Sequence, residues 1–166
     1  HAAAVAGEER IMVPSYNVDS FDKVPEMATP EIARRILRSL GQQTHDVIVA
    51  NFANADMIAH TGNIAAGIEA VRAIDAALAR LAPAFLKRGG TVVVTADHGN
   101  IEDMLNEQTG EVDTEHNANP APLIIAGPKR INPKNHGRLA DVAPTVLRLL
   151  GRKPPKAMTG HSLLLP

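Results

Sequence analysis

A run of β-branched residues leads directly into two metal-ligand side chains in Thr91-Val92-Val93-Val94-Thr95-Ala96-Asp97-His98-Gly99-Asn100. The valines predict a short buried strand, because β-branched side chains pack well on a sheet. Asp97 and His98 follow that strand at its carboxyl end, where ligands collect in open α/β sheets. Polar groups placed directly after a buried run are costly unless they have a role. This stretch therefore predicts an α/β protein with a ligand site at one sheet edge.

A second apolar run precedes this one and is connected to it by a predicted helix. Residues 46–51, with the sequence Asp-Val-Ile-Val-Ala-Asn, predict a buried strand. The segment that follows has apolar residues three and four positions apart, as in a helix: Ile64, Ile68, Val71, Ile74, Leu78 and Leu81. Pro83 is expected to perturb or end this helix. A strand–helix–strand unit predicts two parallel strands with a right-handed crossover, in a mostly parallel sheet flanked by helices.

Four further elements are predicted around this unit. Residues 10–13 predict a short extended segment. Thr29 as N-cap and Pro30 at the first helical position predict a helix that ends at Gly41. Leu123–Ala126 predicts a third short strand. A last helix is expected after Asp141 as N-cap, with Gly151 as its stop signal.

Metal-ligand side chains occur at two further places that are expected at the same sheet edge. Asp56 and His60 follow the 46–51 strand, and their four-residue spacing puts them on one face of a helix. His116 lies in the loop before the third strand, which contains a turn signal at residues 108–111 and is expected to form a small hairpin. Taken singly, Asp56 also fits a helix cap and His116 an ordinary loop histidine. The full set consists of Asp56, His60, Asp97, His98 and His116, which is too many for one tetrahedral ion but fits two divalent ions.

Composition excludes several classes of protein. The chain has 166 residues, which is the size of one ordinary domain, and 45% of them are hydrophobic, although only 2% are aromatic. Its core is therefore expected to consist of Ala, Val, Ile and Leu. A net charge of −1 without a basic block gives no sign of nucleic-acid binding, and no apolar run is long enough to span a membrane. The absence of Cys excludes thiolate zinc sites and fits a reducing, cytoplasmic location.

The ligand segments, together with others in the same order, resemble the cofactor-independent (2,3-bisphosphoglycerate-independent) phosphoglycerate mutases of the alkaline phosphatase superfamily. The segments that carry the resemblance are Ala53-Asn54-Ala55-Asp56-Met57-Ile58-Ala59-His60-Thr61-Gly62, Thr95-Ala96-Asp97-His98-Gly99-Asn100-Ile101-Glu102, and His116 with Asn119-Pro120-Ala121-Pro122. The stretch from Val13-Pro14-Ser15 through Pro25-Glu26-Met27 and the stretch from Leu139-Ala140-Asp141-Val142-Ala143-Pro144-Thr145 through Met158-Thr159-Gly160 extend it, so that it covers nearly the whole chain. A sulfatase or a generic phosphatase is not expected to have all of these segments.

The resemblance implies two Mn²⁺ ions, with Mg²⁺, Co²⁺ or Zn²⁺ as substitutes. It implies that Asp56, His60 and His116 hold one ion and that Asp97 and His98 hold the other. The reaction it implies is the interconversion of 3-phosphoglycerate and 2-phosphoglycerate through a phosphoserine, in glycolysis and gluconeogenesis. One ion would lower the pKa of the serine hydroxyl, and the other would stabilise charge on the phosphoryl oxygens.

The resemblance extends only to the C-terminal part of such an enzyme, so residues 1–166 are interpreted as a segment of the phosphatase domain. His1, without a preceding Met, fits a chain that begins within a longer protein. The family's nucleophilic serine and its inserted substrate-gripping domain are expected elsewhere in the parent enzyme, and no catalytic residue is assigned here. The chain alone is expected to be inactive. Asn17 stands where the family has lysine, and Ala59 where glycine is usual.

Two other readings stay open at this point. Another enzyme of the same superfamily, such as a phosphopentomutase or a phosphonate hydrolase, would share the metal ligands. A non-catalytic metal-binding or assembly module would bind metal without turnover. If the chain is a segment of the mutase, the cut sheet is expected to expose apolar side chains of both strands, namely Val47, Ile48, Val92 and Val94. The chain alone is then expected to be oligomeric, marginally stable, or stabilised by the rest of the parent protein.

Overall fold

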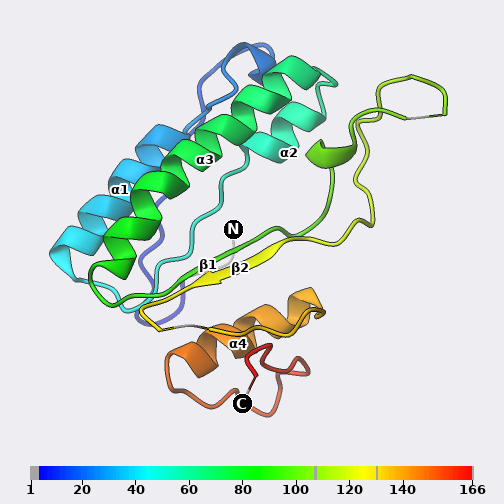
Figure 1. The fold of residues 1–166 in the computed structure, drawn as a ribbon. Helices are drawn as coiled ribbons and strands as arrows, with labels where there is room; N and C mark the ends of the chain where they lie inside the picture. The colour runs from blue at the N-terminus through cyan, green and yellow to red at the C-terminus, as the bar shows by residue number, and fades with distance from the viewer. Residues whose placement is uncertain (1–3, 107, 130, 166) are drawn as a thin grey trace. The chain divides into compact units, whose positions relative to one another are not determined.

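The computed structural model describes residues 4–106, 108–129 and 131–165, and its architecture is α/β as expected (Figure 1). The chain divides into two compact units. The first unit comprises residues 1–78 and 104–114, and the second comprises residues 79–103 and 115–166. Within the described ranges, no helix is long and apolar enough to cross a membrane.

The first unit contains helix α1 (Thr29–Gln42), helix α2 (Asn54–Ala59), the first part of helix α3 (Ile64–Leu86) and the short 3-10 helix η1 (Phe21–Lys23). Thr29 is the first residue of α1 rather than its N-cap, a position taken by Ala28. Its hydroxyl is used elsewhere, because Thr29 Oγ1 donates to Asn54 Oδ1 at 3.2 Å. The helix ends just beyond the expected Gly41, where Gln43 adopts a left-handed conformation with φ 54° and its N–H bonds to Ser39 O.

The long helix α3 buries Leu81 of the predicted apolar stripe, which is 5% exposed, but not the residues at the start of that stripe. Ala70 is 0% exposed, whereas Ile64, Ile68 and Val71 of the predicted apolar stripe are each more than 40% exposed. Alanine side chains allow the closest approach of neighbouring backbone, so the small-residue face, with Ala66, Ala70 and Ala77, is the packed one. Pro83 lies inside α3, which continues to Leu86.

The expected strand at residues 46–51 is not formed, which corrects the predicted parallel pair. Residues 46–51 belong to no strand of the described chain, nor do residues 10–13. Val49 is 91% exposed. An apolar, β-branched run identifies a segment that can be a strand, but pairing depends on a neighbouring strand that the local sequence does not specify.

The second unit contains a two-stranded sheet formed by β1 (Val92–Thr95) and β2 (Leu123–Ala126). The two strands are antiparallel, with Val93 opposite Ile125. Both strands lie where the sequence predicts them, but β1 pairs with β2 rather than in parallel with residues 46–51. As the sequence predicts, Asp97 and His98 follow β1 closely, because the strand ends at Thr95.

The second unit also contains the 3-10 helices η2 (Ile101–Asp103) and η3 (Leu139–Asp141) and the helix α4 (Val142–Leu149). Asp141 occupies the expected N-cap position of α4, but its carboxylate does not cap that helix. It instead accepts hydrogen bonds from the backbone N–H groups of Arg138 and His161, each at 2.8 Å. These bonds, that from His161 first, hold the pKa of Asp141 below its usual range. The carboxylate thereby ties the C-terminal segment to α4.

Thr145 completes this connection, which leads to a stability prediction. Its side chain is fully buried, and its hydroxyl donates to Asp141 O at 2.6 Å and accepts from Leu163 N at 2.9 Å. Thr145→Val keeps the shape but leaves the Leu163 N–H without this acceptor, so the free energy of unfolding should fall by about 1–3 kcal/mol. Urea denaturation followed by circular dichroism measures it; an unchanged midpoint would contradict the assigned role of the hydroxyl.

Candidate metal-ligand residues

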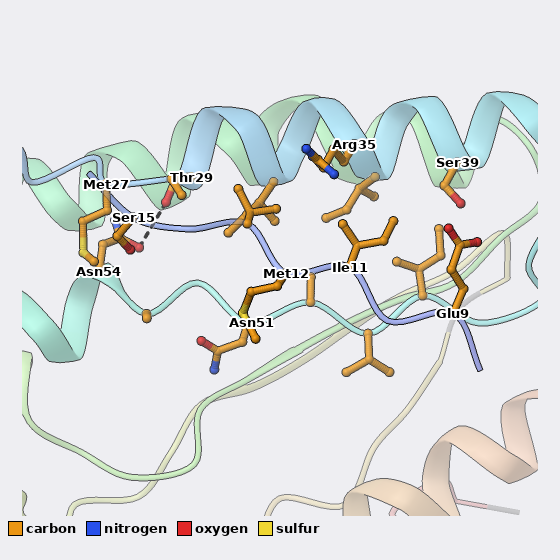
Figure 2. A pocket seen from close by; sticks show the side chains of 18 of the residues that line it. Glu9, Ile11, Met12, Ser15, Met27, Thr29, Arg35, Ser39, Asn51 and Asn54 are labelled. Carbon is orange, nitrogen blue, oxygen red and sulfur yellow. Dashed lines mark hydrogen bonds between the residues drawn. The ribbon is translucent and has the colours of Figure 1, made fainter. Parts of the chain in front are cut away.

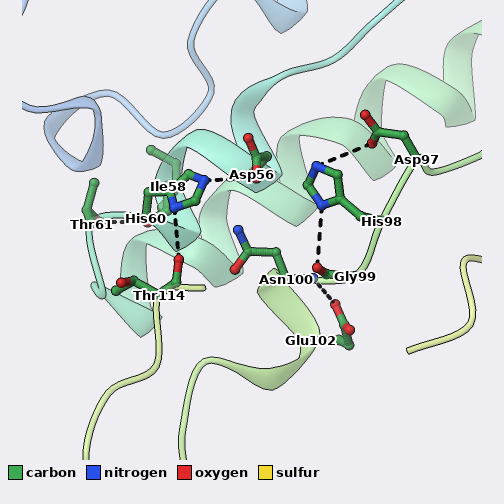
Figure 3. A network of polar contacts seen from close by, with 10 residues as sticks. All are labelled: Asp56, Ile58, His60, Thr61, Asp97, His98, Gly99, Asn100, Glu102 and Thr114. Atoms are coloured by element: carbon green, nitrogen blue, oxygen red, sulfur yellow. Dashed lines mark hydrogen bonds and ion pairs between the residues drawn. The ribbon is translucent and has the colours of Figure 1, made fainter. Parts of the chain in front are cut away.

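Helix α2 presents the two candidate ligands of the first unit on one side. Asp56 lies in the first turn of α2, and His60 is the C-cap residue directly after it. The four-residue spacing brings the two side chains together, with His60 Nε2 3.3 Å from Asp56 Oδ1 (Figure 3). Both side chains are partly exposed, so this pair of potential metal-ligand atoms is accessible from the surface of the unit.

The orientation of the His60 ring is determined by a backbone carbonyl. His60 Nδ1 lies 2.8 Å from Thr114 O (Figure 3). A carbonyl oxygen only accepts, so Nδ1 must carry the proton, and the neutral ring then has its lone pair on Nε2. Metal-binding histidines typically donate their second N–H to such a carbonyl or carboxylate. The contact with Thr114 O therefore places the lone pair of the neutral ring on Nε2, the atom that faces Asp56.

The distance between these two donor atoms also fits a bound ion. Two atoms that each lie about 2.1 Å from a tetrahedral ion are about 3.4 Å apart. The observed separation between Asp56 Oδ1 and His60 Nε2 is 3.3 Å. One carboxylate oxygen and one imidazole nitrogen suit a divalent ion such as Mn²⁺ or Zn²⁺.

The segment that supplies Thr114 O is the small hairpin that the sequence predicts. Leu105 and Val112 form an isolated antiparallel bridge, and Asn106 N donates to Glu111 O at 2.9 Å across the turn. Val112 packs against the turn that follows His60. A Cβ placed on Gly62 would lie 2.8 Å from Val112 Cγ1, and Gly62 has a φ of +72°. Glycine at this position therefore lets the hairpin approach His60.

Substitution of Gly62 should weaken the contact between the hairpin at residues 105–112 and the turn after helix α2. Gly62→Ala adds a methyl group against Val112 and should lower the free energy of unfolding by more than the cost of a left-handed alanine alone, which is about 1–2 kcal/mol. Gly62→Ala in a Val112→Ala background should cost less, because the smaller side chain removes the overlap and leaves only the backbone term. Chemical denaturation of the four proteins of this cycle measures the coupling; strictly additive costs would contradict the contact.

Asn54 holds helix α2 in place, a role that its sequence context did not predict. Its side chain is 1% exposed. Its Nδ2 donates to Ala70 O at 2.9 Å and to Pro25 O at 3.3 Å, and its Oδ1 accepts from Thr29. The residue at the start of α2 is thus tied to α1, to α3 and to the segment before α1. The signal in the sequence that could have indicated this role is an asparagine between two alanines, close to the two candidate ligands.

The second unit brings together its three candidate ligands, Asp97, His98 and His116. His98 Nε2 lies 3.7 Å from Asp97 Oδ1, and His98 Nδ1 lies 3.4 Å from Gly99 O (Figure 3). The rings of His98 and His116 stack with centroids 3.7 Å apart and an interplanar angle of 21°. The bridge between Gly99 and Asn117 holds the two loops next to each other. One carboxylate and two imidazoles, separated by 18 residues of sequence, are thereby gathered at the end of β1.

A cavity of about 470 Å³ lies in the first unit between α1 and the segments 9–15 and 47–54 (Figure 2). Its lining is largely apolar and includes Ile11, Met12 and Val49. Ser15 and Ser39 also line it, but Asp56 and His60 do not. This cavity is therefore distinct from the candidate ligands, and it adjoins the segment that was expected to form a strand.

Comparisons with known proteins agree on one family and on similar relatives. The model of the metalloenzyme superfamily matches residues 1–154. A 2,3-bisphosphoglycerate-independent phosphoglycerate mutase of Pseudomonas syringae pv. syringae is 45% identical over 159 residues, which cover 96% of this chain and 31% of the relative. The protein of the same name from Pseudomonas putida is 47% identical with the same coverage. The chain thus spans about a third of the length of these curated relatives.

The fold is similar to that of a solved phosphoglycerate mutase. The crystal structure of the Leishmania mexicana enzyme at low cobalt concentration superposes with a TM-score of 0.83 at 33% sequence identity. The match covers 92% of this chain and 31% of that chain.

Proposed function

The chain belongs to the metalloenzyme superfamily, and from this premise we propose that it supplies metal ligands to a 2,3-bisphosphoglycerate-independent phosphoglycerate mutase. The proposed reaction interconverts 3-phosphoglycerate and 2-phosphoglycerate, as a cytoplasmic step of glycolysis. Support comes from relatives of that name at 45% and 47% identity and from the order of the ligand segments. Because the chain spans 31% of those relatives, the rest of the parent enzyme is its proposed partner.

We propose Asp56, His60 and His116 as ligands of one divalent ion and Asp97 and His98 as ligands of a second, with Mn²⁺ as the metal. Two such ions, when bound, would activate a serine hydroxyl and stabilise charge on a phosphoryl group. The chain's own residues hold the donors. Thr114 O keeps the proton of His60 on Nδ1 and thereby directs Nε2 towards the ion.

The arrangement of His60 and Asp56 is the strongest support for this proposal. His60 Nε2 and Asp56 Oδ1 lie 3.3 Å apart, and the second ring nitrogen of His60 is already hydrogen-bonded to a carbonyl. The carbonyl favours the tautomer with the lone pair on Nε2, which is the arrangement typical of metal-binding histidines. Preorganised ligands of this kind lower the cost of binding, because the ring does not have to be ordered when the ion arrives.

The sharpest test of the proposed reaction is a chimeric enzyme. Residues 1–166 would replace the matching third of the Pseudomonas putida relative, and turnover of 3-phosphoglycerate would be followed with enolase in the presence of Mn²⁺. The chimera should be active, and Asp97→Asn within it should remove most of that activity. A folded, metal-loaded chimera without turnover would contradict the proposed substrate.

The chain by itself should show no turnover in the same assay. The proposed nucleophile and the substrate-gripping residues belong to the rest of the parent enzyme, and positioning of the reactants supplies much of the rate of such reactions. The chain should nevertheless bind one Mn²⁺ ion in titration calorimetry and bind a second weakly. Turnover by the chain above the blank would show that a nucleophile lies within residues 1–166.

A further inference from the structure

A single carboxylate in the second unit connects the two loops that carry candidate ligands. Glu102, in η2, accepts a hydrogen bond from Asn100 N through Oε2 at 2.9 Å (Figure 3). Its Oε1 accepts from Asn119 Nδ2 at 3.0 Å. Asn100 comes two residues after His98, and Asn119 comes three residues after His116. Glu102 therefore contacts both ligand-bearing loops directly.

The packing around Gly99 shows how close this connection is. A Cβ at Gly99 would overlap Asn117 Oδ1 and Glu102 Oε1, so no side chain fits between the two loops. The backbone of the loops is paired at the same place, with Asn117 N donating to Gly99 O at 3.0 Å. The polar groups that meet here include the Glu102 carboxylate and the side chains of Asn117 and Asn119. The stacked rings of His98 and His116 belong to the same two loops.

The carboxylate is ionised in this position. Desolvation raises the pKa of Glu102, but the hydrogen bonds from Asn119 and from backbone N–H groups outweigh it and lower the pKa to about 2. A charged acceptor makes stronger hydrogen bonds to N–H groups than a neutral one. The hydrogen bonds from Asn100 and Asn119 to the Glu102 carboxylate are therefore present at neutral pH.

We propose that Glu102 is a positioning residue that clamps the Asp97-His98 loop to the His116 loop and keeps the two imidazoles in register. This inference rests on the proposed function for its connection to metal, because the clamp acts on residues proposed as ligands of two ions. Glu102 itself is not proposed as a metal ligand. Both of its oxygens are used by Asn100 and Asn119, and its contribution is to fix where His98 and His116 present their ring nitrogens.

The first test compares the Mn²⁺ affinity of three variants of the chain by titration calorimetry. Glu102→Ala removes both hydrogen bonds and should weaken binding by about 10- to 100-fold, the usual cost of losing an outer contact of a metal site. Glu102→Gln keeps one carbonyl acceptor but turns an NH₂ group towards an N–H donor, so it should lie between Glu102→Ala and the wild type. Asp103→Asn removes the neighbouring exposed carboxylate with the same change of charge and should bind as the wild type does.

The second test needs no metal. In the metal-free wild type, nuclear Overhauser contacts should connect the ring protons of His98 and His116. Glu102→Ala should lose these contacts while its circular dichroism spectrum stays native, and Glu102→Gln should retain part of them. If Glu102→Ala does not fold, Glu102→Gln decides the question with both measurements.

The two tests separate the inference from the proposed function. Failure of the wild-type chain to bind Mn²⁺ would remove the metal assignment, and the ring contacts would then decide the role of Glu102. Ring contacts and affinities in Glu102→Ala and Glu102→Gln equal to those of Asp103→Asn would overturn the inference. Loss of affinity together with loss of the ring contacts would support it.

Discussion

His60→Ala should weaken the binding of Mn²⁺ to the chain by more than about 100-fold, because removing a ligand costs more than the 10- to 100-fold cost of removing an outer contact. The substitution deletes Nε2, which lies 3.3 Å from Asp56 Oδ1, and it also removes the hydrogen bond from Nδ1 to Thr114 O. Titration calorimetry at constant temperature and ionic strength measures the change.

The matched control is His136→Ala, which removes an exposed imidazole from a loop that contains no proposed ligand. It should leave the affinity unchanged. Binding should also weaken as the pH falls, because imidazole must lose its proton before it can bind a metal. Equal Mn²⁺ affinity in the wild type and in His60→Ala would remove the ligand assignment of Asp56 and His60 together.

Asn54→Ala should lower the free energy of unfolding of the chain by about 2–4 kcal/mol, because it leaves several buried polar groups without their partner. Thr29 Oγ1, Pro25 O and Ala70 O all bond to the Asn54 side chain, which is 1% exposed. The substitution also leaves a small cavity at the start of α2. Urea denaturation followed by circular dichroism measures the loss.

Asn51→Ala is the control for this experiment. Asn51 is exposed, three residues earlier in the same segment, and its replacement should change the free energy of unfolding by less than about 0.5 kcal/mol. Asn54→Ala should also weaken Mn²⁺ binding, because α2 carries Asp56 and His60. A protein that loses no stability with Asn54→Ala would show that the hydrogen bonds of this side chain are replaced by water.

The local signals of the sequence determined most of the helices and two of the strands. Pro30 placed the start of α1 within one residue, and the run from Thr91 to Thr95 placed β1 within one residue of its start. The apolar residues before Gly127 placed β2 with the bounds that the structure has. These signals are reliable because they depend on the conformational preferences of each residue and its near neighbours. The α/β class and the scarcity of aromatic residues in the core follow from the same information.

Candidate metal ligands could also be named from the sequence. Asp56 and His60 are four residues apart on a helix, and Asp97 and His98 directly follow a strand, so their proximity within each pair follows from local geometry. His116 needed a contact between distant residues, and its ring stack with His98 is a result of the fold of the second unit. The assignment of these residues to particular ions stays a prediction.

The tertiary structure alone decided which surfaces pack and which strands pair. Of the predicted apolar stripe on α3, Leu81 is buried, but Ile64, Ile68 and Val71 are exposed. Alanines are buried beside them instead, because packing depends on the shape of the neighbouring element. The pairing of β1 with β2, rather than with residues 46–51, is likewise a choice between partners of similar composition. The roles of Asn54, Gly62 and Glu102 arise from hydrogen bonds and close contacts between segments far apart in the chain, and no local pattern encodes such contacts.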